Sequence, residues 1–257
     1  MNPNPMQALR RAVAEIEGSQ PSLDEGGRSL PLGLGELDAA LGGGFALGAV
    51  HELAPSALWH LGATTGFALA LAARADAGSK NTLWIQPDFA GHEAGQLYGP
   101  GLAMFGLSLE RLLVLRVTRP TEALWAMEEA LKCRALVTVI AELTEAGAAA
   151  DLTATRRLTL AARDGGALGL LLRHRPLPEP SAAATRWEIS AAPSEPDAFG
   201  GLGRTAFTLS LRKNRRGSTG RWTVTWDHHE RTFSPLSLGV AQAAADRPDR
   251  APLVHSG

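Results

Sequence analysis

The feature that most constrains this chain is the segment Leu32–Gln86, in which apolar runs alternate with glycine-rich breaks. The break Gly42-Gly43-Gly44 is predicted to end a short helix, because glycine closes a helix at low steric cost. Residues 49–53 (AVHEL) have the aliphatic and β-branched character that is typical of a buried strand. A strand of this kind must be covered by other elements, so the segment favours an α/β fold.

An apolar helix is expected to follow this strand after a loop, beginning near Thr64 or Thr65, since either threonine is able to cap it. Trp84 and Ile85 then supply a second strand. The order of strand, loop, helix and strand is the phosphate-binding unit of nucleotide-hydrolysing folds. The sequence therefore predicts the architecture of such a unit.

The loop of this unit lacks the groups that phosphate binding needs. A working phosphate loop has glycines for backbone approach and a lysine that meets the β and γ phosphates. The chain has three lysines, Lys80, Lys132 and Lys213, and none of them lies in the loop. We interpret the loop as a degenerate phosphate loop, and we expect no cofactor and poor ATP binding. Its candidate residues are Ala54, Ser56, Gly62, Thr64 and Thr65.

A second position that carries a catalytic group in ATPases also lacks that group. Residues 135–141 (ALVTVIA) have the near-continuous apolar character of a strand that is buried on both faces. In an ATPase this strand ends in an aspartate that helps to hold magnesium, whereas here it ends in Ala141-Glu142. Asp88, after Gln86 and Pro87, is interpreted as a loop acid without a role. The sequence therefore predicts no catalytic residue and no metal site.

The composition fits one α/β domain with tails. A chain of 257 residues with 45% hydrophobic content is able to bury a full core, and its net charge of −1 indicates no strong field for nucleic acid or membranes. The single cysteine, Cys133, excludes an internal disulfide and suits a reducing compartment. No apolar run is long enough to span a bilayer. We therefore expect a cytoplasmic protein with no membrane partner.

Three regions are predicted along the chain. Residues 1–30 hold an amphipathic helix and a linker, and the apolar stripe of that helix is Leu9, Val13 and Ile16. Residues 31–235 form the core, and residues 236–257 form a flexible tail with little to bury. The N-terminal helix is interpreted either as a partner contact or as a loosely attached helix.

The second half of the core changes from parallel to antiparallel character. Residues 151–162 are predicted to form a helix that is closed by Gly165 and Gly166, and residues 169–173 form a buried strand. Alternating strands follow at residues 186–189, 205–211 and 221–226. The last two strands are joined by RKNRRGSTG and are expected to form a β-hairpin with a long basic turn.

Three stretches carry a resemblance to a known family. The run GLGELDAALGGGFALGAVHEL at residues 33–53 resembles the entry to the core of RecA-type recombinases, and residues 98–113 resemble a second RecA stretch. Residues 118–133 (TRPTEALWAMEEALKC) resemble the ImuA family, the RecA-like accessory proteins of bacterial damage-induced mutagenesis. The resemblance spans roughly residues 30 to 235 and rests on few sharp motifs.

The resemblance implies a RecA-like, P-loop-type sheet that is mostly parallel and flanked by helices, with an antiparallel C-terminal hairpin. It also implies a non-catalytic role in translesion synthesis under the SOS response. The implied partners are an ImuB-like, polymerase-related scaffold and an error-prone DNA polymerase, with RecA as a further candidate. Two alternatives stay open: a cell-division inhibitor similar to SulA, and an atypical ATPase in DNA repair that uses Lys213 or Arg215 in trans.

The basic turn also has more than one interpretation. Its candidate residues are Arg212, Lys213, Arg215, Arg216 and Arg221, which are followed by Trp222 and Trp226. The turn is either a solvated hairpin tip or a contact for nucleic-acid phosphates, with an exposed tryptophan as a stacking surface. Resemblance adds a third possibility, because Lys213-Asn214-Arg215 is similar to the turn with which RecA-like subunits reach a neighbour's nucleotide.

Overall fold

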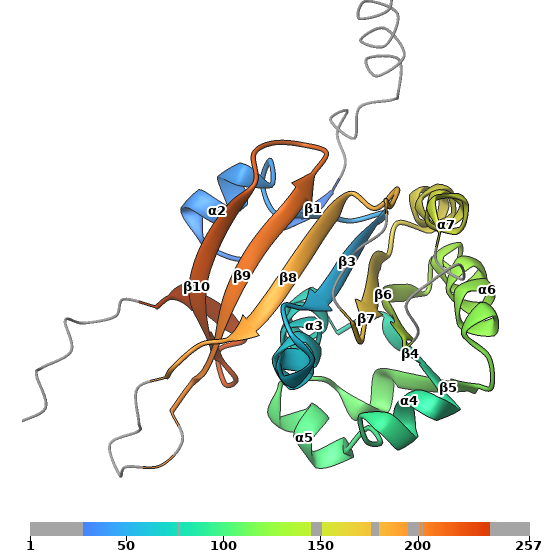
Figure 1. Ribbon diagram of the computed structural model, residues 1–257, viewed down its shortest axis with the longest axis horizontal. Helices are drawn as coiled ribbons and strands as arrows, with labels where there is room; N and C mark the ends of the chain where they lie inside the picture. Colours follow the sequence, from blue (N-terminus) through green and yellow to red (C-terminus); the bar gives the residue numbers. More distant parts are fainter. Residues whose placement is uncertain are drawn as a thin grey trace, which may run out of the picture.

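The computed structural model describes residues 28–76, 78–144, 151–175, 180–194, 201 and 203–236 (Figure 1). The predicted N-terminal helix with Leu9, Val13 and Ile16 lies outside the described residues, as does the tail beyond residue 236. Ser29 and Leu30, at the end of the predicted linker, form a short strand that pairs with Phe45 and Ala46.

Nine strands form one sheet in the order β11-β10-β9-β8-β3-β7-β6-β4-β5. Strands β5, β4, β6, β7, β3 and β8 are parallel, and β9, β10 and β11 continue the sheet as antiparallel neighbours. This arrangement confirms the predicted mostly parallel sheet with an antiparallel hairpin. The strands are β1 (Ser29–Leu30), β2 (Phe45–Ala46), β3 (Ala49–Pro55), β4 (Asn81–Pro87), β5 (Leu112–Val117), β6 (Leu136–Leu143), β7 (Leu168–Arg173), β8 (Thr185–Ala191), β9 (Thr205–Asn214), β10 (Gly220–Asp227) and β11 (Thr232–Pro235).

Helices cover both faces of the sheet (Figure 1). The apolar cluster on one face contains α3, and the cluster on the other face contains α6 and α7. The helices are α2 (Gly35–Ala40), α3 (Leu61–Ala75), α4 (Asp88–Glu93), α5 (Gly99–Met104), α6 (Pro120–Leu131) and α7 (Leu152–Gly165), with two 3-10 turns, η1 (Leu58–His60) and η2 (Leu109–Arg111).

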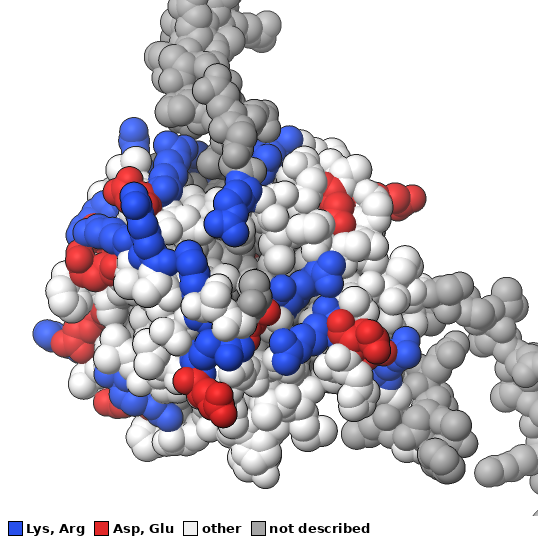
Figure 2. Space-filling model, turned by 180° about the vertical axis from the view of Figure 1, so that it is seen from behind, with Lys and Arg blue, Asp and Glu red and all other residues white. Residues whose placement is uncertain are grey.

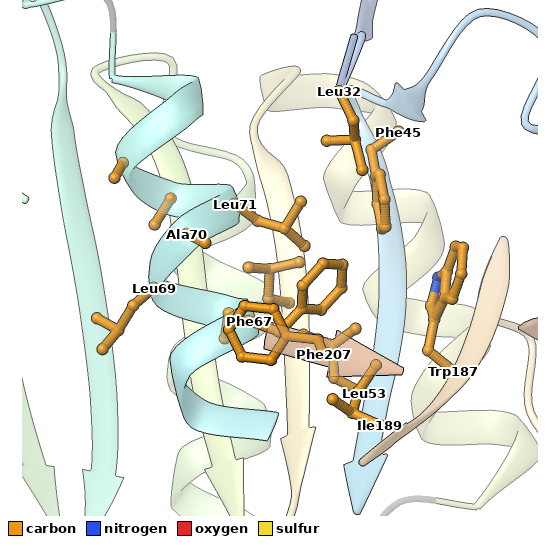
Figure 3. Packing of buried hydrophobic residues seen from close by; sticks show 14 of the residues in the cluster. Leu32, Phe45, Leu53, Phe67, Leu69, Ala70, Leu71, Trp187, Ile189 and Phe207 are labelled. Atoms are coloured by element: carbon orange, nitrogen blue, oxygen red, sulfur yellow. The ribbon is translucent and has the colours of Figure 1, made fainter. Parts of the chain in front are cut away.

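Strand β3 lies at the centre of the sheet, between β7 and β8, and all seven of its residues are buried. Helix α3 packs on one face of this strand, with aromatic rings gathered beside it (Figure 3). The rings of Phe45 and Trp187 stack with their centroids 5.3 Å apart, and Phe67 meets Phe207 edge-on at 5.8 Å. Aromatic burial of this size dominates the stability of a core.

The other face of β3 carries a buried charge. Glu52 is fully buried, and its two carboxylate oxygens accept from Arg173 at 3.1 Å and from Arg186 at 2.9 Å. A carboxylate at such a depth is tolerated only when it is paired and hydrogen-bonded. The two arginines come from the neighbouring strands β7 and β8, so this ion network ties the central three strands together.

Helix boundaries follow the predicted glycine signals. Gly44 has φ 121°, and a Cβ there would lie 2.3 Å from the carbonyl oxygen of Leu30, so no other residue fits the break after α2. Helix α7 begins after Asp151, whose carboxylate accepts from the Ala154 amide at 2.7 Å. It ends at Gly165 and is capped by Gly166, which has φ 78°. The predicted start and the glycine closure of α7 are therefore confirmed, and the helix runs three residues past its predicted end at Ala162.

A chain of buried hydrogen bonds fixes His51 of β3 in its neutral form. Its Nε2–H donates to the Ala46 carbonyl at 2.9 Å, which leaves Nδ1 to accept from the Thr185 hydroxyl at 2.7 Å. That hydroxyl oxygen in turn accepts from the Trp187 indole at 2.7 Å. Burial lowers the pKa of His51 to about 4, against a smaller raising effect of the bond to Ala46.

This network predicts a loss of stability in mild acid. The pKa of His51 is lowered on folding from 6.5 to about 4, so between these values only the unfolded chain binds the proton. At pH 5 the free energy of unfolding is expected to be about 2 kcal/mol lower than at pH 7, since each pKa unit corresponds to about 1.4 kcal/mol. Urea unfolding at both pH values measures the difference.

The matched variant is His51→Gln, whose amide is able to donate to Ala46 and accept from Thr185 without titrating. It should be less stable than the wild type at pH 7, because it fits the site less well, but it should lose about 2 kcal/mol less on acidification. Identical pH profiles for the two proteins would show that His51 does not control the acid response.

Candidate functional site

The connection between β3 and α3 is much shorter than the predicted loop. Strand β3 runs to Pro55, the 3-10 turn η1 begins at Leu58, and α3 follows at Leu61. Only Ser56 and Ala57 lie between strand and turn. The expectation that the helix starts at Thr64 or Thr65 with a threonine cap is therefore wrong. The Thr64 hydroxyl instead donates to the His60 carbonyl, one helical turn earlier, at 3.0 Å.

The polar groups of this connection are used to hold it against the end of β8. The Ser56 amide donates to the Ile189 carbonyl at 2.9 Å, and the hydroxyl groups of Ser56 and Ser190 are 2.6 Å apart. The Ala191 amide donates to Nδ1 of His60 at 3.1 Å. A phosphate loop works by curling free backbone amides around an anion. The connection between β3 and α3 is instead hydrogen-bonded to β8.

The five residues predicted for the degenerate phosphate loop are therefore divided among three elements. Ala54 is a buried residue of β3, Ser56 lies in the two-residue link, and Gly62, Thr64 and Thr65 belong to the first turns of α3. Leu58 and Trp59 of η1 point their apolar side chains into solvent, and Trp59 is 82% exposed. The structure does not bring the five residues together as a cradle.

A buried polar cluster lies at the carboxyl ends of the neighbouring strands. Glu142 of β6 accepts from the Trp84 indole at 2.5 Å and from the Gln86 amide at 2.8 Å through one oxygen. Its other oxygen accepts from Nε2 of His174, just after β7, at 2.9 Å. Two of the three polar partners of this carboxylate therefore come from β4, and the third directly follows β7; both strands are neighbours of β6 in the sheet.

The cluster borders a cavity of about 240 Å³ under α3 and α5. Its walls include Thr65, Tyr98 and Phe105, together with Gln86, Glu142 and His174. Such a position, outside the carboxyl ends of parallel strands, is where α/β sheets bind ligands. Two buried atoms of the cluster, Oε1 of Gln86 and Nδ1 of His174, have no hydrogen-bond partner among the described residues.

The chemistry open to this cluster is limited because both carboxylate oxygens of Glu142 are already engaged. Gln86 is an amide, which is not able to act as a general base, and Asp88 stands exposed at the start of α4 rather than in a loop. No group of three or more metal-binding side chains occurs in the part of the chain that the structure describes.

His174 is a residue of the cluster that the sequence patterns did not single out, although a signal existed. It follows the predicted buried strand at residues 169–173 directly, and the ends of parallel strands meet at one edge of a sheet. Nothing in the sequence shows that Trp84 supplies a donor to Glu142, because these residues are distant in the chain.

The basic turn lies at the opposite end of the sheet from this cluster. Thr185, at the start of β8, pairs with Asn214, so the turn after β9 is placed at the amino ends of the parallel strands (Figure 1). Within one chain, Lys213 and Arg215 are therefore far from the position of a phosphate loop. Across the face in Figure 2, basic side chains are spread over a broad area, with acidic side chains interspersed among them.

Only part of the basic turn is free in solvent. Arg212, Arg215 and Arg221 are exposed, although Arg212 is paired with Glu188 at 3.1 Å, whereas Lys213 and Arg216 are half-buried. The Lys213 ammonium donates to the Ser181 carbonyl, and burial lowers the pKa of Lys213, with the charge of Arg215 as the second cause. The expectation that the charges of the turn stand freely in water is thus wrong for Lys213.

The predicted stacking surface is also absent from this hairpin. Trp226 is fully buried, and Trp222 is half-buried with its ring 6.2 Å from that of Trp187. Both indoles pack with the core of the sheet. The exposed tryptophans among the described residues are Trp59 and Trp125, which belong to η1 and α6.

The fold and the site define an α/β protein with a nine-stranded, mostly parallel sheet, in which the connection between β3 and α3 forms no phosphate cradle. Two curated relatives, both named Protein ImuA, come from two strains of Caulobacter vibrioides. Each is 31% identical over 200 residues, which cover 71% of this chain and 77% of the relative. The chain belongs to the ImuA family. No protein-family profile matches it.

Among the described residues, no helix has the length and apolar character needed to cross a membrane.

The cluster predicts that Glu142 is a structural residue. Replacing it by Ala leaves the Trp84 indole and the Gln86 amide without their acceptor in a buried site. The free energy of unfolding should fall by about 3 kcal/mol, since each unsatisfied buried group costs about 1–3 kcal/mol. Urea unfolding measures the change. The control Glu128→Ala, in an ion pair whose arginine is exposed, should cost no more than about 1 kcal/mol. Equal losses would argue against a structural role.

Proposed function

We propose that this protein is a RecA-like, non-catalytic accessory factor of DNA-damage-induced translesion mutagenesis. It acts by binding other components of the mutagenesis machinery rather than by hydrolysing ATP. Membership of the ImuA family supports the cellular role. The short connection from β3 to α3, bound to β8 through Ser56 and His60, is the observation that carries the non-catalytic assignment.

Three features support the RecA-like part of the proposal. The parallel strands follow the order β5-β4-β6-β7-β3-β8, with the strand of the lost phosphate loop, β3, inside the sheet. The positions where such folds carry catalytic side chains, the ends of β4 and β6, hold Gln86 and Glu142. These two residues are hydrogen-bonded to each other. The antiparallel strands then extend the sheet at one edge.

Exposed apolar side chains support a binding role. Trp59 and Trp125 are 82% and 63% exposed, and the edge strand β5 exposes Leu113, Val114 and Leu115. Aromatic residues in solvent are enriched at sites of protein association. The proposed partners are an ImuB-like, polymerase-related scaffold and an error-prone DNA polymerase, with RecA as a further partner. We also propose that the exposed arginines of the basic turn contact nucleic acid.

The first test is ATP turnover by the purified protein. Without a loop lysine and a free carboxylate at the end of β6, two charge-stabilising groups are missing. Each such group typically contributes about 10²–10³ in rate, so turnover should stay below about 10⁻³ per second, against about 1–100 for ordinary phosphoryl-transfer enzymes. A coupled assay with magnesium and ATP measures the rate. Hydrolysis at ordinary rates that is lost in Thr64→Val would overturn the non-catalytic assignment.

The second test concerns partner binding through the N-terminal segment. Replacing Leu9 and Val13 with Asp places two charges on the predicted apolar stripe of that segment. Capture of the scaffold and polymerase subunits by the tagged protein should fall at least about tenfold, because burying such charges at an interface is costly. The control Arg10→Asp/Arg11→Asp alters the opposite side of the predicted helix. Capture that is unchanged in the stripe variant would identify the segment as a passive tail.

A further inference from the structure

A second cavity, of about 360 Å³, lies between α7 and the turn of the basic hairpin. We call it the arginine pocket. Three arginines line it: Arg156 and Arg163 from α7, and Arg215 from the turn. Its remaining lining residues are Leu152, Thr159, Leu160 and Ala182. This cavity is separate from the one at Glu142, because the two share no lining residue.

The three guanidinium groups have no acidic partner among the described residues, whereas the neighbouring Arg157 is paired with Glu128 at 2.6 Å. Although Arg215 is exposed as a whole, partial burial of its guanidinium group lowers its pKa, and the charges of Arg163 and Arg156 lower it further. The three positive charges repel each other around the cavity, and no carboxylate in the described part of the chain balances them. This repulsion lowers the stability of the folded protein, and a bound anion would remove it.

The pocket is held together by hydrogen bonds between its three walls. The Thr155 hydroxyl accepts from the Ala182 amide at 3.0 Å, and the Thr159 hydroxyl donates to the Ala182 carbonyl at 3.3 Å. The Arg215 amide donates to the Ala184 carbonyl at 3.0 Å. Helix α7, the segment before β8 and the basic turn therefore form one rigid frame. A rigid frame lowers the entropy cost of binding.

We propose that the arginine pocket is a binding site for phosphate groups, and that in function it holds the backbone of a single-stranded nucleic acid. Guanidinium groups suit phosphate because their planar donor forks bind two oxygens at once. The exposed side chains of Leu152 and Leu160 beside the arginines offer apolar surface to sugars or bases. Arg215 belongs to both the pocket and the turn, so a single strand of nucleic acid is able to contact the pocket and the turn together.

The inference deepens the proposed nucleic-acid contact and rests on that part of the proposed function. The variants that test the pocket lie in α7, whereas the role in mutagenesis is tested by ATP turnover and partner capture. Failure of the pocket proposal is therefore distinguishable from failure of the proposed function. A further variant, Arg212→Gln/Arg221→Gln, alters only exposed residues of the turn and reports on contact there. Loss of binding in this turn variant alone would support the turn contact and overturn the pocket.

The experiment is a fluorescence-anisotropy titration of a labelled oligothymidylate of about 20 nucleotides at several salt concentrations. The variant Arg156→Gln/Arg163→Gln should bind at least about tenfold more weakly at low salt than the wild type. Its salt slope should fall by about 1.4, since each phosphate contact on a single strand contributes about 0.7. Arg163→Lys keeps the charge but loses the forked guanidinium donors, so its affinity should lie between those of the wild type and the double variant.

Arg157→Gln is the matched control, because it removes an arginine from the next position of the same helix, outside the pocket. It should change the affinity less than about twofold. All variants should melt within about 2 °C of the wild type, because they alter exposed side chains. If the double variant does not fold, the single change Arg163→Gln carries the same comparison. Equal losses in Arg157→Gln and Arg163→Gln would overturn the proposal.

Two competitors identify the source of the phosphate. Displacement of the oligonucleotide by about 1 mM ATP, lost in the double variant, would keep the phosphate site but assign it to a free nucleotide. A labelled polyglutamate of about 20 residues tests the other anion. If polyglutamate binding depends on Arg156 and Arg163 while oligonucleotide binding does not, the pocket recognises an acidic polypeptide and the phosphate proposal is wrong.

Discussion

The burial of β3 on both faces is the constraint on which the rest of this structure depends. A strand that is covered by α3 on one side and by α7 on the other has no water for its polar side chains. His51 and Glu52 are therefore satisfied entirely from within, by Thr185 and Ala46 and by Arg173 and Arg186. These partners come mostly from β7 and β8. The hydrogen bonds that satisfy the polar side chains of β3 therefore also fix which strands lie beside it in the sheet.

The order of strands places the carboxyl ends of the parallel strands side by side, where related architectures bind a ligand, and in this protein these ends are hydrogen-bonded to one another. Ser56 and His60 bind the end of β8, and Glu142 collects donors from β4 and from the residue after β7. Three donors therefore take up most of the acceptor sites of the Glu142 carboxylate. The hydrogen bonds of this cluster hold neighbouring strand ends together.

Charge is distributed unevenly between the two ends of the sheet. The carboxyl ends hold a carboxylate that is enclosed by three donors, whereas the amino ends carry the basic turn and the arginine pocket. A net charge of −1 for the whole chain conceals this separation. The contrast has a simple cause: the hairpin of β9 and β10 runs antiparallel to β8, so it returns its arginines to the edge where the parallel strands begin.

The sequence by itself determined the elements and the class of fold. Apolar runs, glycine breaks and alternating C-terminal strands identified the parallel core and the hairpin, because these signals are local. The missing lysine is equally local, so the composition of the loop alone was enough to exclude the phosphate-loop motif. The start of α3 at Leu61, the donors around Glu142 and the meeting of Arg215 with Arg156 were decided only by the tertiary structure. Each depends on residues far apart in the chain, and no local pattern records which strand end or turn will face another.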